Sequence, residues 1–144
     1  MPQQNKRYET FEEIKHVAMK HYADNNFCAV ASLTVVCQVP YGKAFNTLKK
    51  LGRRKGKGTY TPHTLQAVNA LNCRFEEVRV PCTTINQAEK YFKGIRGNYL
   101  VRVQGHMLSI RDGVIMDWTA GKTSRRRVLN VWKIEKYIRE RKVV

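Results

Sequence analysis

The stretch FCAVASLTVVCQV, residues 27–39, decides how this chain of 144 residues folds. It is apolar on every side of a helix, which is typical of a helix buried at the centre of a domain. Pro40 follows directly and ends the helix. Ser32, Thr34 and Gln38 interrupt the apolar run, and it is shorter than the roughly 20 residues that span a bilayer. We therefore expect a domain built around this helix.

Amphipathic helices and short strands surround this stretch. Residues Glu9 to Tyr22 show an apolar helical face, with Thr10 at the N-cap and Glu13 at capping-box spacing. The chain then shows, in order, a helix from Pro40 or Tyr41 to Gly52, a helix over residues 62–71 capped by Thr61 with Pro62 at its first position, a strand from Arg74 to Val80 and a helix from Thr84 to Phe92. A hairpin from Tyr99 to Trp118, a strand from Val128 to Ile134 and a charged C-terminal helix follow. Helices come first and antiparallel strands last, which is the α+β pattern. We expect a single domain over residues 1–144, with residues 1–8 as a flexible tail.

The expected hairpin brings a histidine close to a carboxylate. Asp112 and Gly113 form a dipeptide that favours a two-residue type I′ turn. With these two residues in the turn, side-chain alternation puts Asp117 on the same face as His106, as its diagonal neighbour at roughly 7 Å or less between Cβ atoms. A carboxylate in that position can accept a hydrogen bond from the imidazole and hold its tautomer. A purely structural His–Asp pair would have the same spacing.

The four cysteines differ in their surroundings. None forms a CxxC pair or a zinc-finger spacing, and without an export signal a disulfide framework is not expected. Cys28 begins the apolar helix after the polar residues 23–26, so its sulfur lies where backbone N–H groups and the helix dipole favour a thiolate. Cys37 is nine residues further on and points to the opposite side of that helix, into the core. Cys73 and Cys82 have neither a capping context nor a paired histidine.

Together these patterns indicate a cysteine nucleophile with its base. A thiol at a helix start, with a later histidine oriented by an acid on an adjacent strand, is the arrangement in which a base activates the nucleophile. Cys28, His106 and Asp117 fill these three positions. His21 lies closer to Cys28 in sequence and is the second-rank alternative for the base.

Three segments resemble one known superfamily. DNNFCAVASLTVV, LGRRKGKGT and NYLVRVQGHMLSIRDGVIMDW, in this order between Asp24 and Trp132, look like the papain-like cysteine peptidases. The nearest members are small ones, such as the peptidases that process bacteriocin leaders and compact papain-like proteins of bacteriophages and bacteria. The resemblance implies a papain-like α+β fold, with the nucleophile at the start of a central helix and helices packed on a C-terminal antiparallel sheet. It implies Cys28 as nucleophile, His106 as general base and acid, and Asp117 as the orienting residue.

The resemblance also implies an activity, with one departure. The expected enzyme is a cysteine peptidase or isopeptidase that works through a thioester, and an acyl-transferase is a close variant. Such enzymes commonly carry an oxyanion-hole Gln six residues before the nucleophile, where this chain has Tyr22. Asn25 or Asn26 could donate an amide N–H instead, beside the Cys28 backbone N–H, although both also fit helix capping and turn formation. If neither Asn donates to the oxyanion, the oxyanion hole consists of backbone N–H groups only, or the chain is a pseudoenzyme.

The charge of the chain bears on its partners. Lys and Arg number 27 against 11 Asp and Glu, a formal net charge of +16, which favours anionic partners, although a solvated basic surface gives the same count. Two clusters in expected loops are candidate anion- or substrate-binding residues: Arg53, Arg54, Lys55 and Lys57, and Arg125, Arg126 and Arg127. The first lies among glycines but lacks the P-loop Lys-Ser/Thr, so nucleotide hydrolysis is not expected.

These observations leave two classes of function open. The first is the hydrolase, acting on a peptide or protein substrate with acidic character. The second is an inactive papain-like scaffold that serves as a basic nucleic-acid-binding or virion-associated module, in which exposed aromatic residues supply stacking surfaces. We expect no cofactor and no metal. The N-terminal residues lack the apolar region of a signal peptide, so we expect a cytoplasmic protein, or a virion protein if a bacteriophage encodes it.

Overall fold

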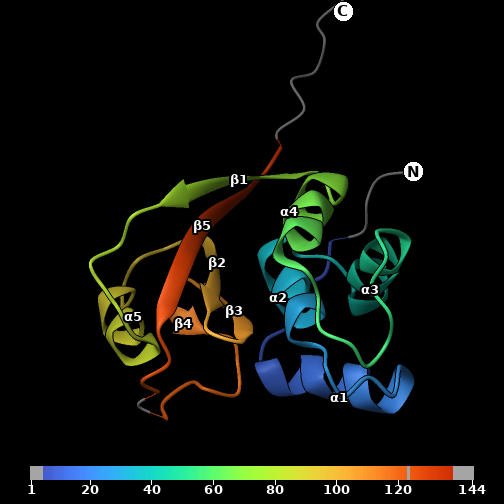
Figure 1. Cartoon of the computed structure of the whole chain (residues 1–144), viewed down its shortest axis with the longest axis horizontal. Coiled ribbons are helices and arrows are strands. Elements are labelled where there is room, and N and C mark those ends of the chain that lie inside the picture. The colour runs from blue at the N-terminus through green and yellow to red at the C-terminus, as the bar shows by residue number, and fades with distance from the viewer. Residues whose placement is uncertain (1–4, 123, 138–144) are drawn as a thin grey trace, which may run out of the picture.

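Helix α2 (Cys28–Val36) lies at the centre of the fold, against one face of a five-stranded antiparallel sheet (Figure 1). The structure is a computed structural model that describes residues 5–122 and 124–137. All residues from Ala29 to Val36 are buried, as the apolar run predicts. The other elements are α1 (Phe11–His21), α3 (Tyr41–Lys50), α4 (Thr61–Ala70), α5 (Ile85–Tyr91), β1 (Cys73–Val78), β2 (Asn98–Val103), β3 (His106–Arg111), β4 (Val114–Ile115) and β5 (Val128–Lys136).

The sheet, in the order β1-β5-β2-β3-β4, separates two apolar cores. Leu100 and Trp132 pack into the core formed with α1 to α4. Their strand neighbours Val101 and Val131 point to the opposite face, where they pack with residues of α5. In Figure 1, α2, α3 and α4 lie to one side of the sheet and α5 to the other. The expected α+β class is confirmed.

Most expected helices are present, with shifted ends. Thr10 caps α1 and accepts a hydrogen bond from the Glu13 backbone N–H at 3.3 Å. Helix α2 ends before Pro40, because the backbone turns into the left-handed region at Gln38, where φ is 52°. Helix α4 begins one residue earlier than expected, so that Thr61 is its first residue and Tyr60 its N-cap.

The expected hairpin over Tyr99 to Trp118 is wrong as a single unit: strands β2, β3 and β4 form a meander with two tight turns. The second turn is the expected one, with φ of 50° at Asp112 and 83° at Gly113, which fits type I′. Gly113 is required there for a second reason, because a Cβ at this position would lie 2.6 Å from the Phe92 carbonyl oxygen. Strand β4 is short, and the chain leaves the ladder before Asp117.

The segment before α1 is anchored to the domain. Tyr8 is buried, and its hydroxyl accepts a hydrogen bond from the Tyr41 backbone N–H at 3.1 Å. Arg111, buried at the end of β3, donates to the Tyr8 carbonyl at 2.6 Å. Tyr8, the last residue of the expected tail, is therefore packed into the domain.

At the other end, β5 continues to Lys136, two residues beyond its expected end. The rest of the expected C-terminal helix, residues 138–144, lies outside the described residues. Within the described part of the chain, no single helix is long and apolar enough to cross a membrane; only the pair α2 and α3, bent by 119°, passes by length and composition.

Candidate active site

Cys28, His106 and Asp117 meet at a cavity of about 280 Å³. Cys28 is the first residue of α2, His106 is the first residue of β3, and Asp117 follows β4. The described residues that line the cavity are Phe11, Lys15, Asn25, Asn26, Phe27, Cys28, Gly105, His106, Asp117 and Trp118.

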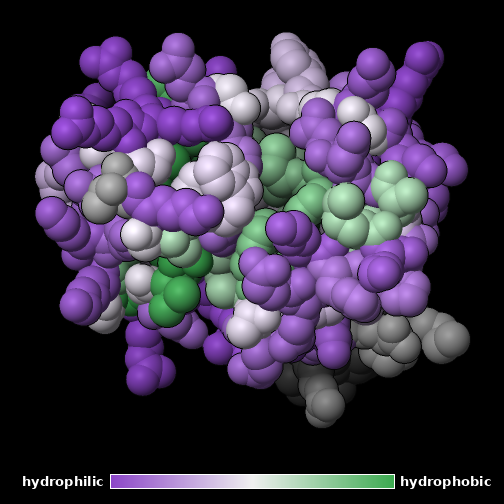
Figure 2. Space-filling view, turned by 90° about the horizontal axis from the view of Figure 1, so that it is seen from below, coloured by the Kyte–Doolittle hydropathy of each residue, from purple (hydrophilic) through white to green (hydrophobic). Residues whose placement is uncertain are grey.

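Seen from below, the molecule is mostly hydrophilic, with apolar side chains gathered in a band across the middle of that face (Figure 2).

His106 and Asp117 form a close pair. The Nε2 atom of His106 lies 2.9 Å from Oδ1 and 3.0 Å from Oδ2 of Asp117. Only 7% of the His106 side chain and 3% of the Asp117 side chain are exposed, so water competes little for this contact. The hairpin spacing predicts this proximity. The contact is made from the turn that follows β4, however, and not across a β-ladder.

Thr119 holds the carboxylate of Asp117 in place. The Thr119 hydroxyl donates to Asp117 Oδ2 at 2.6 Å, and the Thr119 backbone N–H donates to the same oxygen at 3.1 Å. Sequence reasoning missed Thr119. Its signal was present, because an Asp side chain commonly accepts from the backbone two residues later in a turn.

The surroundings of Cys28 and His106 favour a thiolate beside an imidazolium. Burial acts to raise the pKa of Cys28, but the hydrogen bond with His106, the imidazolium charge and a hydrogen bond from the Met107 backbone bring it below its ordinary value. Burial acts to lower the pKa of His106, yet the hydrogen bonds with Asp117 and Cys28 raise it to about 9. Because Nε2 faces Asp117, Nδ1 is the ring nitrogen left for Cys28.

The start of α2 leaves its own N–H groups open. The N-cap is Phe27, and no described side chain caps this end. Cys28 therefore begins the helix as expected, but the polar residues before it do not cap that helix. Asn25 and Asn26 instead line the cavity beside Cys28. The first-turn N–H groups and the helix dipole thus act on the sulfur and on any oxyanion formed next to it.

The segment before Cys28 is tied to the basic loop through a buried ion pair. Asp24 is fully buried and accepts hydrogen bonds from Arg53 Nη2 at 2.7 Å and from the Gly56 N–H at 3.2 Å. Arg53 Nη2 also donates to the Asn26 carbonyl at 2.6 Å. Arg53 is therefore not a solvated residue of the basic loop. Its side chain is buried and fixes the Asp24–Asn26 segment that leads to Cys28.

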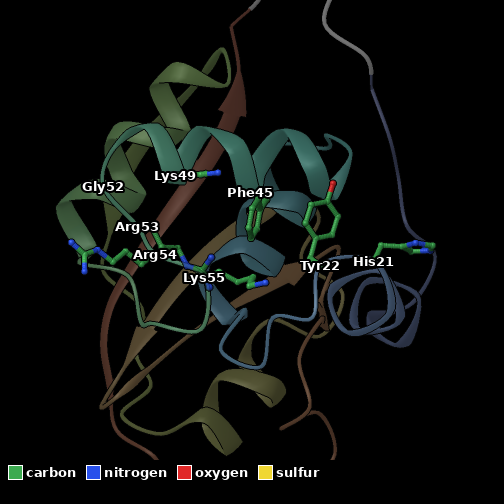
Figure 3. A pocket seen from close by; sticks show the side chains of 8 residues that line it. All are labelled: His21, Tyr22, Phe45, Lys49, Gly52, Arg53, Arg54 and Lys55. Carbon is green, nitrogen blue, oxygen red and sulfur yellow. The ribbon is translucent and has the colours of Figure 1, made fainter.

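Tyr22 and His21 belong to a different part of the molecule. The Tyr22 ring packs against Tyr41 and Phe45, with centroids 5.0 Å and 4.8 Å away. Both His21 and Tyr22 line a second cavity, shown in Figure 3, and neither lines the cavity that holds Cys28. The structure therefore brings His106, and not His21, to the candidate nucleophile.

The remaining basic candidates are exposed, and one contacts a ring that lines the candidate active site. Arg54, Lys55 and Lys57 are exposed in the first loop, and Arg125, Arg126 and Arg127 in the second. The Arg126 guanidinium lies 5.5 Å from the ring centroid of Trp118. The same ring lies 5.7 Å from the His106 ring and lines the cavity, whereas Arg126 itself is not among the lining residues. The sequence does not predict that Arg126 and His106 lie beside the same ring, because it does not predict where Trp118 packs.

The other cysteines are buried. Cys37 and Cys73 share a hydrogen bond that raises the pKa of Cys37 well above, and lowers that of Cys73 below, the ordinary value. Burial raises the pKa of Cys82. Among residues 5–122 and 124–137, no group of three or more His, Cys, Asp or Glu side chains could hold a metal ion.

The fold and the site thus describe an α+β domain with a polarised Cys–His–Asp arrangement at the start of its central helix. Comparisons of the chain with protein-family models, curated proteins and solved structures find no match.

Proposed function

We propose that this chain is a papain-like cysteine hydrolase that cleaves a peptide or isopeptide bond through a thioester at Cys28. The observation that carries the proposal is that Cys28, His106 and Asp117 line one cavity, with His106 Nε2 2.9 Å from Asp117 Oδ1. Its support is physical: the pKa of the thiol is lowered and that of the imidazole is raised to about 9, so the reactive ion pair exists between these two pKa values.

The residues would act in a defined order. The Cys28 thiolate attacks the carbonyl carbon, and the developing oxyanion accepts hydrogen bonds from the Cys28 backbone N–H and from Asn25 or Asn26. His106 gives its proton to the leaving amine as the C–N bond breaks. It then takes a proton from the water that attacks the thioester, and collapse of this intermediate releases the acid and restores the Cys28 thiolate beside protonated His106. Asp117 holds the imidazole throughout.

The walls of the cavity suggest the kind of substrate. Phe11, Phe27 and Trp118 supply apolar surface, while Lys15 lies in the same lining. Arg126 contacts the Trp118 ring and adds a second cation near this lining. A substrate with an apolar residue near the cleaved bond and acidic residues around it fits this lining.

The test is labelling with an electrophilic peptide probe, followed by mapping of the modified residue. We expect one modification, at Cys28, that is lost in Cys28→Ala and kept in the matched control Cys82→Ala. Incubation of the unlabelled protein with a peptide library is expected to give free carboxylic acids. Labelling that survives Cys28→Ala would contradict the proposal. Labelling of Cys28 without any turnover would indicate an inactive scaffold.

A further inference from the structure

A larger cavity, of about 790 Å³, lies beside α3 and the basic loop. Its eight described lining residues are His21, Tyr22, Phe45, Lys49, Gly52, Arg53, Arg54 and Lys55. Figure 3 shows Phe45 and Tyr22 side by side, with the Lys49 amine above and the Lys55 amine below the Phe45 ring in this view. Apart from Arg53, these side chains have no part in the chemistry proposed for Cys28.

The lining carries positive charge without a compensating acid. Lys49 comes from α3, and Arg54 and Lys55 come from the loop that follows, and all three are exposed. None of the eight described lining residues is acidic. A concave surface of one sign of charge concentrates ligands of the opposite sign. The cavity therefore favours an anion.

Arg53 gives the cavity a buried donor that lacks an acceptor. Only 2% of its side chain is exposed, and Nη2 is held by Asp24 and the Asn26 carbonyl. Its Nε, in contrast, has no hydrogen-bond partner among the residues that the structure describes. A buried donor normally has a partner, because an unsatisfied one is costly. An anionic oxygen that reached Arg53 from the cavity would supply it.

The two aromatic side chains in the lining indicate which kind of anion fits this cavity. Tyr22 and Phe45 are half-buried, with ring centroids 4.8 Å apart, and the Arg53 guanidinium lies 5.8 Å from the Phe45 centroid. A phosphate alone, or an acidic peptide, needs only the cations. A base joined to a phosphate uses the rings and the cations together, as single-stranded nucleic acids do when they bind proteins.

We propose that this cavity binds a nucleotide unit of single-stranded nucleic acid. The phosphate contacts Lys49 and Lys55 and gives the Arg53 Nε its acceptor, and the base packs against Phe45 and Tyr22. This site is separate from Cys28, although Arg53 links the two by holding the Asp24–Asn26 segment. Binding at this cavity does not depend on the hydrolase chemistry.

The experiment measures binding of a fluorescent oligothymidine to the full chain by anisotropy, as a function of salt. The double substitution Lys49→Gln with Lys55→Gln is expected to weaken binding about tenfold. It should also lower the steepness of log K against log salt by about 0.7, since the two lysines share one phosphate and each neutralised single-strand phosphate contributes about 0.7. The control Lys90→Gln with Lys93→Gln removes the same charge from exposed positions at α5 and should leave both values nearly unchanged. Equal losses in the two double variants would overturn the proposal.

Three further arms test the nature of the ligand. Phe45→Leu, which keeps an apolar side chain in the same packing, should weaken oligothymidine but not oligoglutamate of equal charge. Oligoglutamate that binds as tightly as the oligonucleotide, or a free nucleotide that competes equally with the strand, would contradict a single-strand site. Cys28→Ala should leave oligonucleotide binding unchanged, so failure of this proposal and failure of the proposed hydrolase are distinguished.

Discussion

Cys28 and Cys37 lie at the two ends of helix α2, yet their thiols have opposite properties. The pKa of Cys28 is below its ordinary value, because the hydrogen bond and charge of His106 outweigh the effect of burial. The pKa of Cys37 is well above it, because Cys37 shares a hydrogen bond with the Cys73 thiol and is buried. The positive end of the helix dipole also acts on Cys28, whereas Cys37 lies at the negative end. Since burial acts to raise the pKa of both thiols, the comparison shows that the partner group decides which thiol can react.

The largest effect on the difference between the two thiols is expected from substitution of His106, since His106 lowers the pKa of Cys28. His106→Gln takes away both the hydrogen bond and the positive charge beside Cys28, so the pKa of Cys28 should rise toward that of an ordinary buried thiol. Peptide hydrolysis should fall by about 10²- to 10⁴-fold, the range for loss of a general acid and base. The rate of product formation measures the effect. His16→Gln, at an exposed position on α1, is the matched control and should retain activity. Full activity in His106→Gln would rule out the assigned base.

A smaller effect is expected from Thr119, which touches neither Cys28 nor the substrate in the proposed mechanism. Thr119→Val removes the hydroxyl that donates to Asp117, and the loss of one hydrogen bond to a charged group corresponds to about a tenfold fall in turnover. Because Asp117 raises the pKa of His106 to about 9, a less firmly held carboxylate should lower that pKa. The alkaline limb of the pH–rate profile should then move to lower pH.

Thr119→Ser separates this positioning role from simple packing. Serine keeps the hydroxyl, so it should restore both the rate and the position of the alkaline limb. If Thr119→Ser and Thr119→Val are equally impaired, or if the limb stays in place in Thr119→Val, the hydroxyl does not position Asp117.

The sequence predicts those features of the fold and the site that depend on neighbouring residues in the chain. The Asp112-Gly113 turn fixes the pairing of Arg111 with Val114, and from that register Asp117 could be placed near His106. The apolar run of α2 likewise places Cys28 at a helix start. The preceding turn, after β2, was missed, because Gln104-Gly105 lacks the Asn-Gly or Asp-Gly signal of such hairpins.

Contacts between distant segments could not be predicted in the same way. In the sequence, Arg53 has the pattern of a solvated basic loop. Its side chain is buried because it pairs with Asp24, 29 positions away. Tyr8 looks like part of a polar tail, and only Arg111, 103 positions further on, shows that it is anchored. Local patterns carry no information about such partners, since the fold alone brings them together.

The most direct test of the central claim is the pH dependence of alkylation at Cys28 by iodoacetamide, with the modified residue identified by peptide mapping. We expect the rate to rise at a pH below the range of an ordinary thiol, since protonated His106 stabilises the Cys28 thiolate. We expect His106→Gln to move this rise to higher pH. This support for the thiolate is present below the His106 pKa of about 9 and is lost as His106 deprotonates above it. A rise in the ordinary thiol range that is the same in the wild type and in His106→Gln would contradict the account.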